Sequence, residues 1–179
     1  MVTTEKSTTP PQETGLCTLR NESADAAENL DRMVKAVEAV VVDETDLIAA
    51  LANISAVLMA YLGEINWAGF YIQKGNELVL GPFQGLPACT RIGAGKGVCG
   101  KAAAAGKTVI VPNVHEFPGH IACDSASASE IVIPLFRGGR VYGVLDVDSP
   151  RLNRFSPPEA EALNRIGDLI SAFLDRYEH

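Results

Sequence analysis

Three cysteines in the glycine- and proline-rich middle of the chain could carry redox chemistry. Cys89, Cys99 and Cys123 lie in segments of small and turn-forming residues, and the chain shows no sign of secretion. Thiols in a cytosolic protein stay reduced unless they take part in a reaction, so cysteines in loops favour a thiol–disulfide cycle. These residues predict a small redox enzyme, with buried and inert cysteines as the alternative.

The spacing of possible ligands does not predict a metal site. No two cysteines have the Cys-x-x-Cys spacing of a zinc site, and the three histidines fit no ligand pattern. We therefore expect no metal and no other cofactor.

Three acidic residues are predicted to meet on one face of a sheet. Asp146 and Asp148 are two positions apart in a predicted strand, and Glu130 begins the strand expected to pair with it. Repulsion and burial would raise the pKa of at least one carboxyl group, so that it keeps a proton near neutral pH. Which group keeps the proton stays open, and a solvated hairpin end is the alternative for the two aspartates.

Two aromatic residues could enclose an apolar part of a ligand. Trp67 and Tyr71 are four positions apart in a predicted strand and therefore share a face, with Gly69 between them. Packing in a hydrophobic core is the other common use of such rings.

Composition indicates one globular domain that does not bind nucleic acid. The chain has 179 residues, 47% of them hydrophobic, and a formal net charge of −7, which would repel phosphate backbones and anionic lipid. Residues 1–20 are expected to form a flexible tail and residues 21–179 a single domain. The sequence shows neither a secretory signal nor a membrane span, so we expect a cytoplasmic protein.

The elements that must position these residues are helices at both ends and strands between them. Apolar residues recur every three or four positions in residues 23–42, and a second helix is expected over residues 47–62. Thr45 or Asp43 could cap the second helix, and Gly63 could end it in the left-handed conformation. A closing helix is expected to begin at Ser156.

Extended patterns fill the middle of the chain and predict an α+β fold. Strands are expected over residues 65–72, 78–80, 108–111, 130–136 and 141–147, with a short helix over residues 97–105. An antiparallel sheet with the N-terminal and C-terminal helices on one face and a loop-rich pocket on the other satisfies this order.

The order of elements resembles the GAF domain, a module that binds small molecules. A more specific resemblance, to the free methionine-R-sulfoxide reductase family, covers the chain from about residue 30 onward. Cys17 and the tail have no counterpart in it. The resemblance is carried by the segments NWAGFY (66–71), LGPFQG (80–85), PACTRI (87–92), GVCG (97–100), DSASASEIVIP (124–134) and LDVDS (145–149).

This resemblance implies that the chain reduces free methionine-R-sulfoxide to methionine, with thioredoxin as the reductant. It implies Cys123 as the attacking thiol, Cys89 as the resolving thiol and Cys99 as a third cysteine of the motif. A sulfoxide needs a thiolate to attack its sulfur and an acid to protonate its oxygen. The expected catalytic residues are Cys123, Cys89, Cys99, Glu130 and Asp148, and the expected substrate-binding residues are Trp67, Tyr71, Asp146, Glu130 and Asp148.

Two other hypotheses remain open at the level of the sequence. A non-enzymatic GAF sensor would bind a small ligand in the same pocket and regulate a partner. The helices over residues 23–62 could also pack between two subunits, and such a homodimer is compatible with an enzyme.

Overall fold

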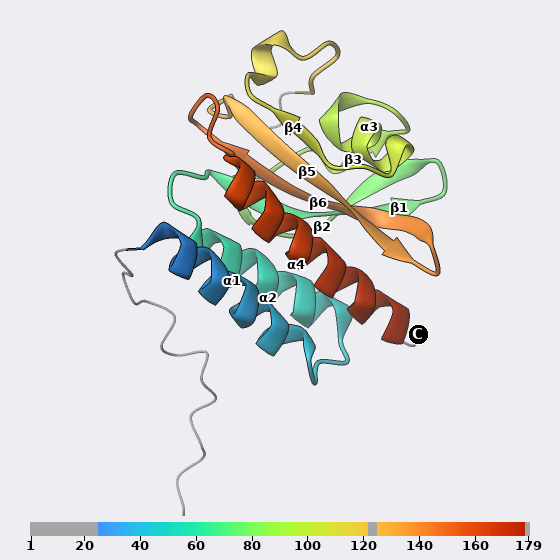
Figure 1. Ribbon diagram of the computed structural model, residues 1–179. Helices are drawn as coiled ribbons and strands as arrows, with labels where there is room; N and C mark the ends of the chain where they lie inside the picture. Colours follow the sequence, from blue (N-terminus) through green and yellow to red (C-terminus); the bar gives the residue numbers. More distant parts are fainter. Residues whose placement is uncertain (1–24, 122–124, 178–179) are drawn as a thin grey trace, which may run out of the picture.

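The centre of the structure is an antiparallel sheet with helices on both faces (Figure 1). The computed structural model describes residues 25–121 and 125–177. Within these residues the sheet has six strands in the order β3-β2-β1-β6-β5-β4. The strands are β1 (Trp67–Lys74), β2 (Glu77–Gly85), β3 (Arg91–Gly93), β4 (Val109–Val111), β5 (Ser129–Arg137) and β6 (Arg140–Ser149). The predicted α+β architecture, with the N-terminal and C-terminal helices on one face of an antiparallel sheet, is confirmed.

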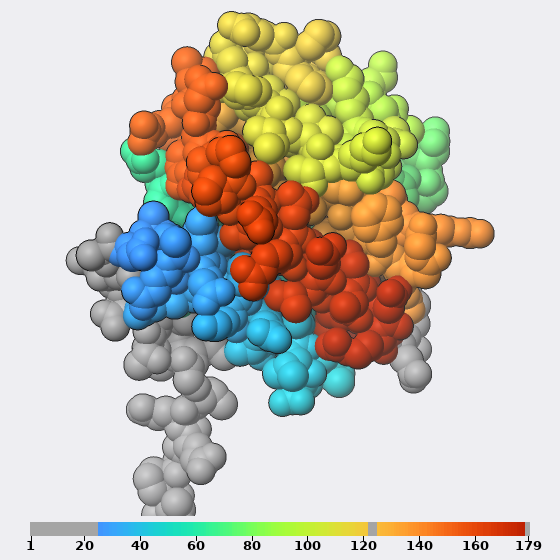
Figure 2. Space-filling model, viewed as in Figure 1, coloured from blue at the N-terminus to red at the C-terminus, as the bar shows by residue number. Residues whose placement is uncertain are grey.

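Three helices cover one face of the sheet and a short one covers the other. Helices α1 (Ala26–Val41), α2 (Leu47–Tyr61) and α4 (Pro157–Arg176) form the first layer, in which α4 contacts β5 and α1 packs on α4. Figure 2 shows α4, in orange and red, running across this side of the molecule next to α1, in blue. Helix α3 (Gly97–Ala105) packs on the opposite face, and the one-turn helix η2 (Val114–Glu116) follows β4. No helix in the described part of the chain is long and apolar enough to cross a membrane.

The residues that cap the helices differ from the expected ones at α2 and match them at α4. Asp46, rather than the expected Thr45 or Asp43, caps α2, because its carboxylate lies where it can accept a hydrogen bond from the amide of Ala49. The left-handed residue after α2 is Glu64, at φ 59°, and not the expected Gly63. At α4 the expected start is correct, since Ser156 forms a capping box with Glu159.

Strand β2 is longer than the sequence predicts. The expected strand ended at Leu80, but β2 continues through Gly81 and Pro82 to Gly85. The register between β1 and β2 shifts beside Phe70, so that Gly81 and Pro82 oppose a single residue of β1. A proline cannot donate a ladder hydrogen bond, and a β-bulge tolerates it.

Alternation along the strands divides the buried residues into two cores. The helix-side core lies under α1, α2 and α4, and the α3-side core lies on the opposite face of the sheet. The helix-side core includes Met33, Leu51, Ile54, Leu58, Phe70, Ile131, Leu145, Leu163, Ile170 and Phe173. The α3-side core consists of Trp67, Tyr71, Leu78, Ile92, Val98, Cys99, Ala102, Val111, Val114, Val132 and Val144.

Candidate active site

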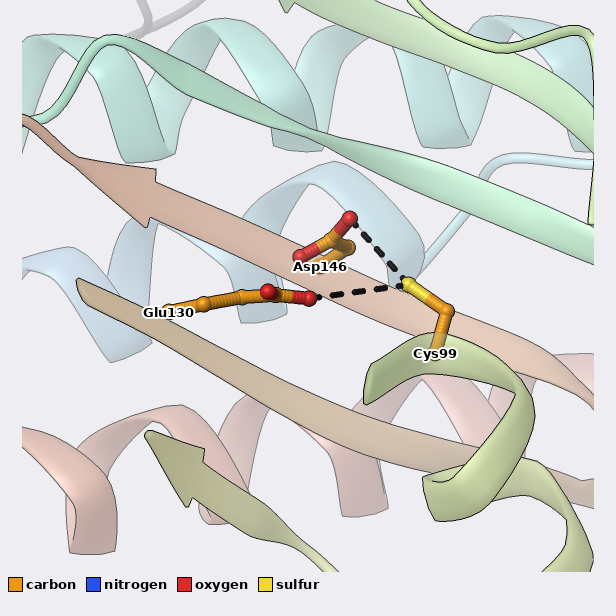
Figure 3. Close-up of side chains that lie close together, drawn as sticks. All are labelled: Cys99, Glu130 and Asp146. Atoms are coloured by element: carbon orange, nitrogen blue, oxygen red, sulfur yellow. Dashed lines mark hydrogen bonds between the residues drawn. The ribbon is translucent and has the colours of Figure 1, made fainter. Parts of the chain in front are cut away.

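A thiol and two carboxyl groups meet in the α3-side half of the molecule (Figure 3). Cys99 Sγ lies 3.2 Å from Asp146 Oδ2, to which it donates a hydrogen bond, and 4.0 Å from Glu130 Oε1. The three side chains come from α3, β6 and β5 and point toward one another. All three residues are buried, with exposed fractions of 3% for Cys99, 5% for Glu130 and 6% for Asp146.

Strand pairing brings the acidic residues together. In the register of β5 and β6, Glu130 pairs with Asp148 and Val132 pairs with Asp146. Side chains two positions apart share a face, so Asp146 and Asp148 both lie on the α3 side, where Glu130 joins them. The predicted convergence of the three carboxyl groups is therefore seen in the sheet register.

Helix α3 packs closely against the turn after β3 because Gly100 has no side chain. A Cβ atom on Gly100 would lie 3.0 Å from the carbonyl oxygen of Gly93 and 3.1 Å from the backbone of Gly95. The glycine therefore lets the helix pack against the turn after β3. This packing places Cys99 over Glu130 and Asp146, in the short helix expected over residues 97–105 and not in a loop.

Burial makes this site hold protons near neutral pH. Desolvation is the main cause that raises the pKa of Cys99 and of Glu130 well above their ordinary values, and the charge of Asp146 adds to both. Desolvation also raises the pKa of Asp146 to about 7, although hydrogen bonds with Cys99 and Glu130 oppose it. No described N–H or O–H group donates to the buried Asp146 Oδ1. A proton on one of the two carboxyl groups satisfies both of them.

Aromatic rings form a wall beside the acidic residues. The ring of Trp67 stacks against Tyr71 and Phe83, with centroids 5.9 and 5.3 Å apart. The Trp67 indole donates to the carbonyl oxygen of Leu86 at 3.2 Å, and the Tyr71 hydroxyl donates to that of Cys89 at 3.0 Å. Trp67 and Tyr71 thus share a face, as expected, and they belong both to the α3-side core and to the lining of a cavity.

Two small cavities meet at the aspartates. The first has a volume of about 30 Å³ and is lined by Cys99, His120 and Glu130, among others. The second, about 10 Å³, lies against Trp67 and Tyr71, and Asp146 and Asp148 line both cavities. The first volume suits one or two water molecules and the second at most one. Both are smaller than a free amino acid.

The predicted cysteines have different surroundings. Cys89 is half-buried in the connection between β2 and β3, whereas Cys99 is buried in α3, and both are free thiols. Cys123, the predicted nucleophile, and Cys17 lie outside the described residues, as does the predicted tail over residues 1–20.

Three further residues belong to the site without having been assigned to it from the sequence. His120 Nε2 lies 3.8 Å from Glu130 Oε2, and burial lowers the pKa of the imidazole, with a smaller effect from His115. Ser127 accepts a hydrogen bond from Asn66 and lines the first cavity. Phe83 continues the aromatic stack. Phe83 and Ser127 lie in segments that carry the family resemblance, and His120 lies three positions before Cys123, but a solvent-exposed loop was at least as good an interpretation of His120.

Comparison with known proteins places this site in a family. The GAF domain model, in its GAF_2 form, matches residues 41–175, so the chain is a GAF-domain protein. The free methionine-R-sulfoxide reductase of Escherichia coli is 49% identical over 72% of this chain and 78% of its own length. The enzyme of the same name from Saccharomyces cerevisiae is 40% identical over 80% and 84%. Within the GAF proteins the chain belongs to the free methionine-R-sulfoxide reductase family, whose members are oxidoreductases.

A solved structure supports the same assignment. The free methionine-R-sulfoxide reductase of Neisseria meningitidis, solved in complex with its substrate, superposes with a TM-score of 0.83 at 45% identity. The alignment covers 88% of this chain and 96% of that one.

Proposed function

We propose that this chain reduces free L-methionine-R-sulfoxide to L-methionine. The observation that carries the proposal is a buried, proton-holding pair of carboxyl groups, Glu130 and Asp146, next to the wall of Trp67 and Tyr71. The names of the relatives and the substrate complex of the Neisseria protein support the choice of substrate.

The first chemical step is assigned to Cys123. Its thiolate attacks the sulfoxide sulfur, the S–O bond breaks, and the oxygen passes to the cysteine as a sulfenic acid while methionine leaves. The basic oxygen must be protonated as that bond breaks. Glu130, Asp146 and Asp148 are the proton sources that the site offers, and an ionised member of the three can bind the substrate ammonium group.

A second thiol must then resolve the sulfenic acid. Its sulfur displaces the hydroxyl group as water and forms a disulfide with Cys123. Burial raises the pKa of Cys99 well above its ordinary value, which disfavours the thiolate that this step needs. Cys89 is more exposed, so we assign it as the resolving thiol, with Cys99 as the alternative. We further propose that thioredoxin reopens the disulfide in the cytoplasm and that the chain can act as a homodimer.

The aromatic wall and the carboxyl groups suit the two ends of the substrate. The rings of Trp67 and Tyr71 can pack on the methylsulfinyl group, while the aspartates of the two cavities face the charged end. A site that recognises the free ammonium group would discriminate against methionine sulfoxide within a peptide.

The test is a measurement of methionine released from purified reduced protein. With dithiothreitol, we expect turnover of the free R-sulfoxide and little turnover of the S epimer or of a peptide. Cys123→Ser should abolish it. With thioredoxin as reductant, Cys89→Ser should release about one methionine per chain and then stop, because no internal thiol resolves the sulfenic acid.

The controls separate this proposal from its alternatives. If Cys99→Ser stalls after one turnover and Cys89→Ser does not, the resolving role belongs to Cys99. If no methionine forms with any reductant, although the protein binds the sulfoxide, the chain is a ligand-binding GAF module and the proposed reaction is wrong.

A further inference from the structure

We propose that Cys99, Glu130 and Asp146 form a binding site for a thiophilic divalent cation such as Zn²⁺ or Cd²⁺. This inference concerns metal binding and does not depend on sulfoxide reduction. One ligand atom each from Cys99, Glu130 and Asp146 lies within 4.8 Å of the other two.

The distances between these atoms match those around a tetrahedral ion. Zinc binds sulfur at about 2.3 Å and carboxylate oxygen at about 2.1 Å, which puts neighbouring sulfur and oxygen ligands roughly 3.5 Å apart. The distances from Cys99 Sγ to the carboxylates of Asp146 and Glu130, 3.2 and 4.0 Å, lie on either side of this value. His120 Nε2 lies 3.8 Å from the other oxygen of Glu130, Oε2, so the imidazole borders the site without being one of its three clustered ligands.

The site also lacks a positive charge that a metal would supply. Asp146 Oδ1 is buried and receives no hydrogen bond from a described donor. Among the described residues that line this cavity there is no lysine and no arginine, whereas Asp148 adds another carboxylate. A cation can therefore replace the proton that otherwise satisfies the two carboxyl groups, and the thiol proton leaves to solvent together with it.

The ligand types determine which metals fit. A thiolate among the ligands favours zinc and other soft or borderline ions, whereas Mg²⁺ and Ca²⁺ prefer sites made of oxygen alone. The metal would bind the carboxyl groups of Glu130 and Asp146, which the proposed reaction needs for the substrate. Metal and substrate should thus exclude each other.

The experiment is a titration of the reduced full-length chain with Cd²⁺, followed by the ultraviolet thiolate-to-cadmium charge-transfer band and by equilibrium dialysis. We expect one Cd²⁺ per chain with a charge-transfer band. A chain that keeps Cys99 alone, with Cys17, Cys89 and Cys123 all changed to Ser, should retain both signals. Cys99→Ser should lose the band and bind at least about 100-fold more weakly.

Cys89→Ser serves as the matched control, and circular dichroism verifies the folding of every variant. Asp146→Asn provides a second test of the site, since it should weaken binding while leaving the thiol in place. Retention of the band in Cys99→Ser, or its loss in the chain that keeps Cys99 alone, would overturn the proposal. Because the titration needs no turnover, its result is independent of whether the chain reduces methionine sulfoxide.

Discussion

The two faces of the sheet use the same strands for different purposes. Toward α1, α2 and α4, the buried side chains are almost all apolar and form the larger core. Toward α3, the same strands bury Glu130 and Asp146 together with Cys99. The helix-side core stabilises the fold through hydrophobic burial, whereas the α3 side holds ionisable groups at a cost in stability. The comparison indicates that stability and chemistry can be changed separately.

The largest effect is expected on the helix side, from Phe173→Ala. Phe173 is 1% exposed, and its truncation should lower the free energy of unfolding by about 3–5 kcal/mol. Urea denaturation measures this loss, and Ile48→Ala, at a site that is 62% exposed, is the control. In the folded protein the KM for the sulfoxide should stay unchanged, and a large change in KM would contradict the separation of the two faces.

On the α3 side, Asp146→Asn should stabilise the protein at alkaline pH. Burial raises the pKa of Asp146 from 3.8 to about 7 in the folded chain. Between these values the unfolded chain loses the proton and the folded chain keeps it, so the stability of the native protein falls as pH rises. Asparagine does not ionise, and the gain should be absent below about pH 4 and reach roughly 2–4 kcal/mol above about pH 8.

Denaturation curves at both pH values measure the effect of Asp146→Asn, with the exposed Asp168→Asn as the control. Equal stability of Asp146→Asn and the native chain at alkaline pH would show that Asp146 ionises without cost in the folded state.

Gly69→Ala should disturb the aromatic wall. An added Cβ would lie 2.3 Å from Phe83 Cβ and 2.7 Å from the Trp67 ring, so the stack must shift. Overpacking of this kind costs about 1–3 kcal/mol and should raise the KM for the sulfoxide. The matched control is Gly63→Ala, which has no atom within 4 Å of its new Cβ. If both variants behave alike, the stack does not limit substrate binding.

The smallest effect is expected from Tyr71→Phe. It removes the hydrogen bond to the carbonyl oxygen of Cys89, worth about 1 kcal/mol. The segment around Cys89 should loosen, and the alkylation rate of Cys89, followed by peptide mass spectrometry, should rise. Tyr142→Phe, on the helix side of the sheet, is the control. An unchanged alkylation rate would show that this hydrogen bond does not hold the segment.

Local patterns predicted the parts of the fold that depend on periodicity. Apolar spacing predicted α1, a long apolar stretch predicted α2, and Ser156 with the prolines after it predicted the start of α4. The shared face of Asp146 and Asp148 follows from strand alternation. Local patterns did not predict that β2 continues through Pro82, because this continuation depends on a bulge in the pairing of β2 with β1.

The local sequence also did not predict which residues surround Cys99 and His120. Helix α3 consists largely of glycine and alanine, so its sequence has no apolar stripe that shows which side is buried. The contact between Cys99 and Asp146 joins residues 47 positions apart. His120 reaches Glu130 from a segment without regular structure. Such contacts depend on tertiary packing, which spacing along the chain does not encode.

The two edge strands of the sheet, β3 and β4, have three residues each. A long, flat edge strand would expose a row of unpaired backbone N–H and C=O groups, with which a strand from another molecule could pair. In this sheet each edge strand exposes only a short row of such groups. Aggregation by strand addition is accordingly disfavoured, and two copies of the chain should associate through helix or loop surfaces instead of extending the sheet.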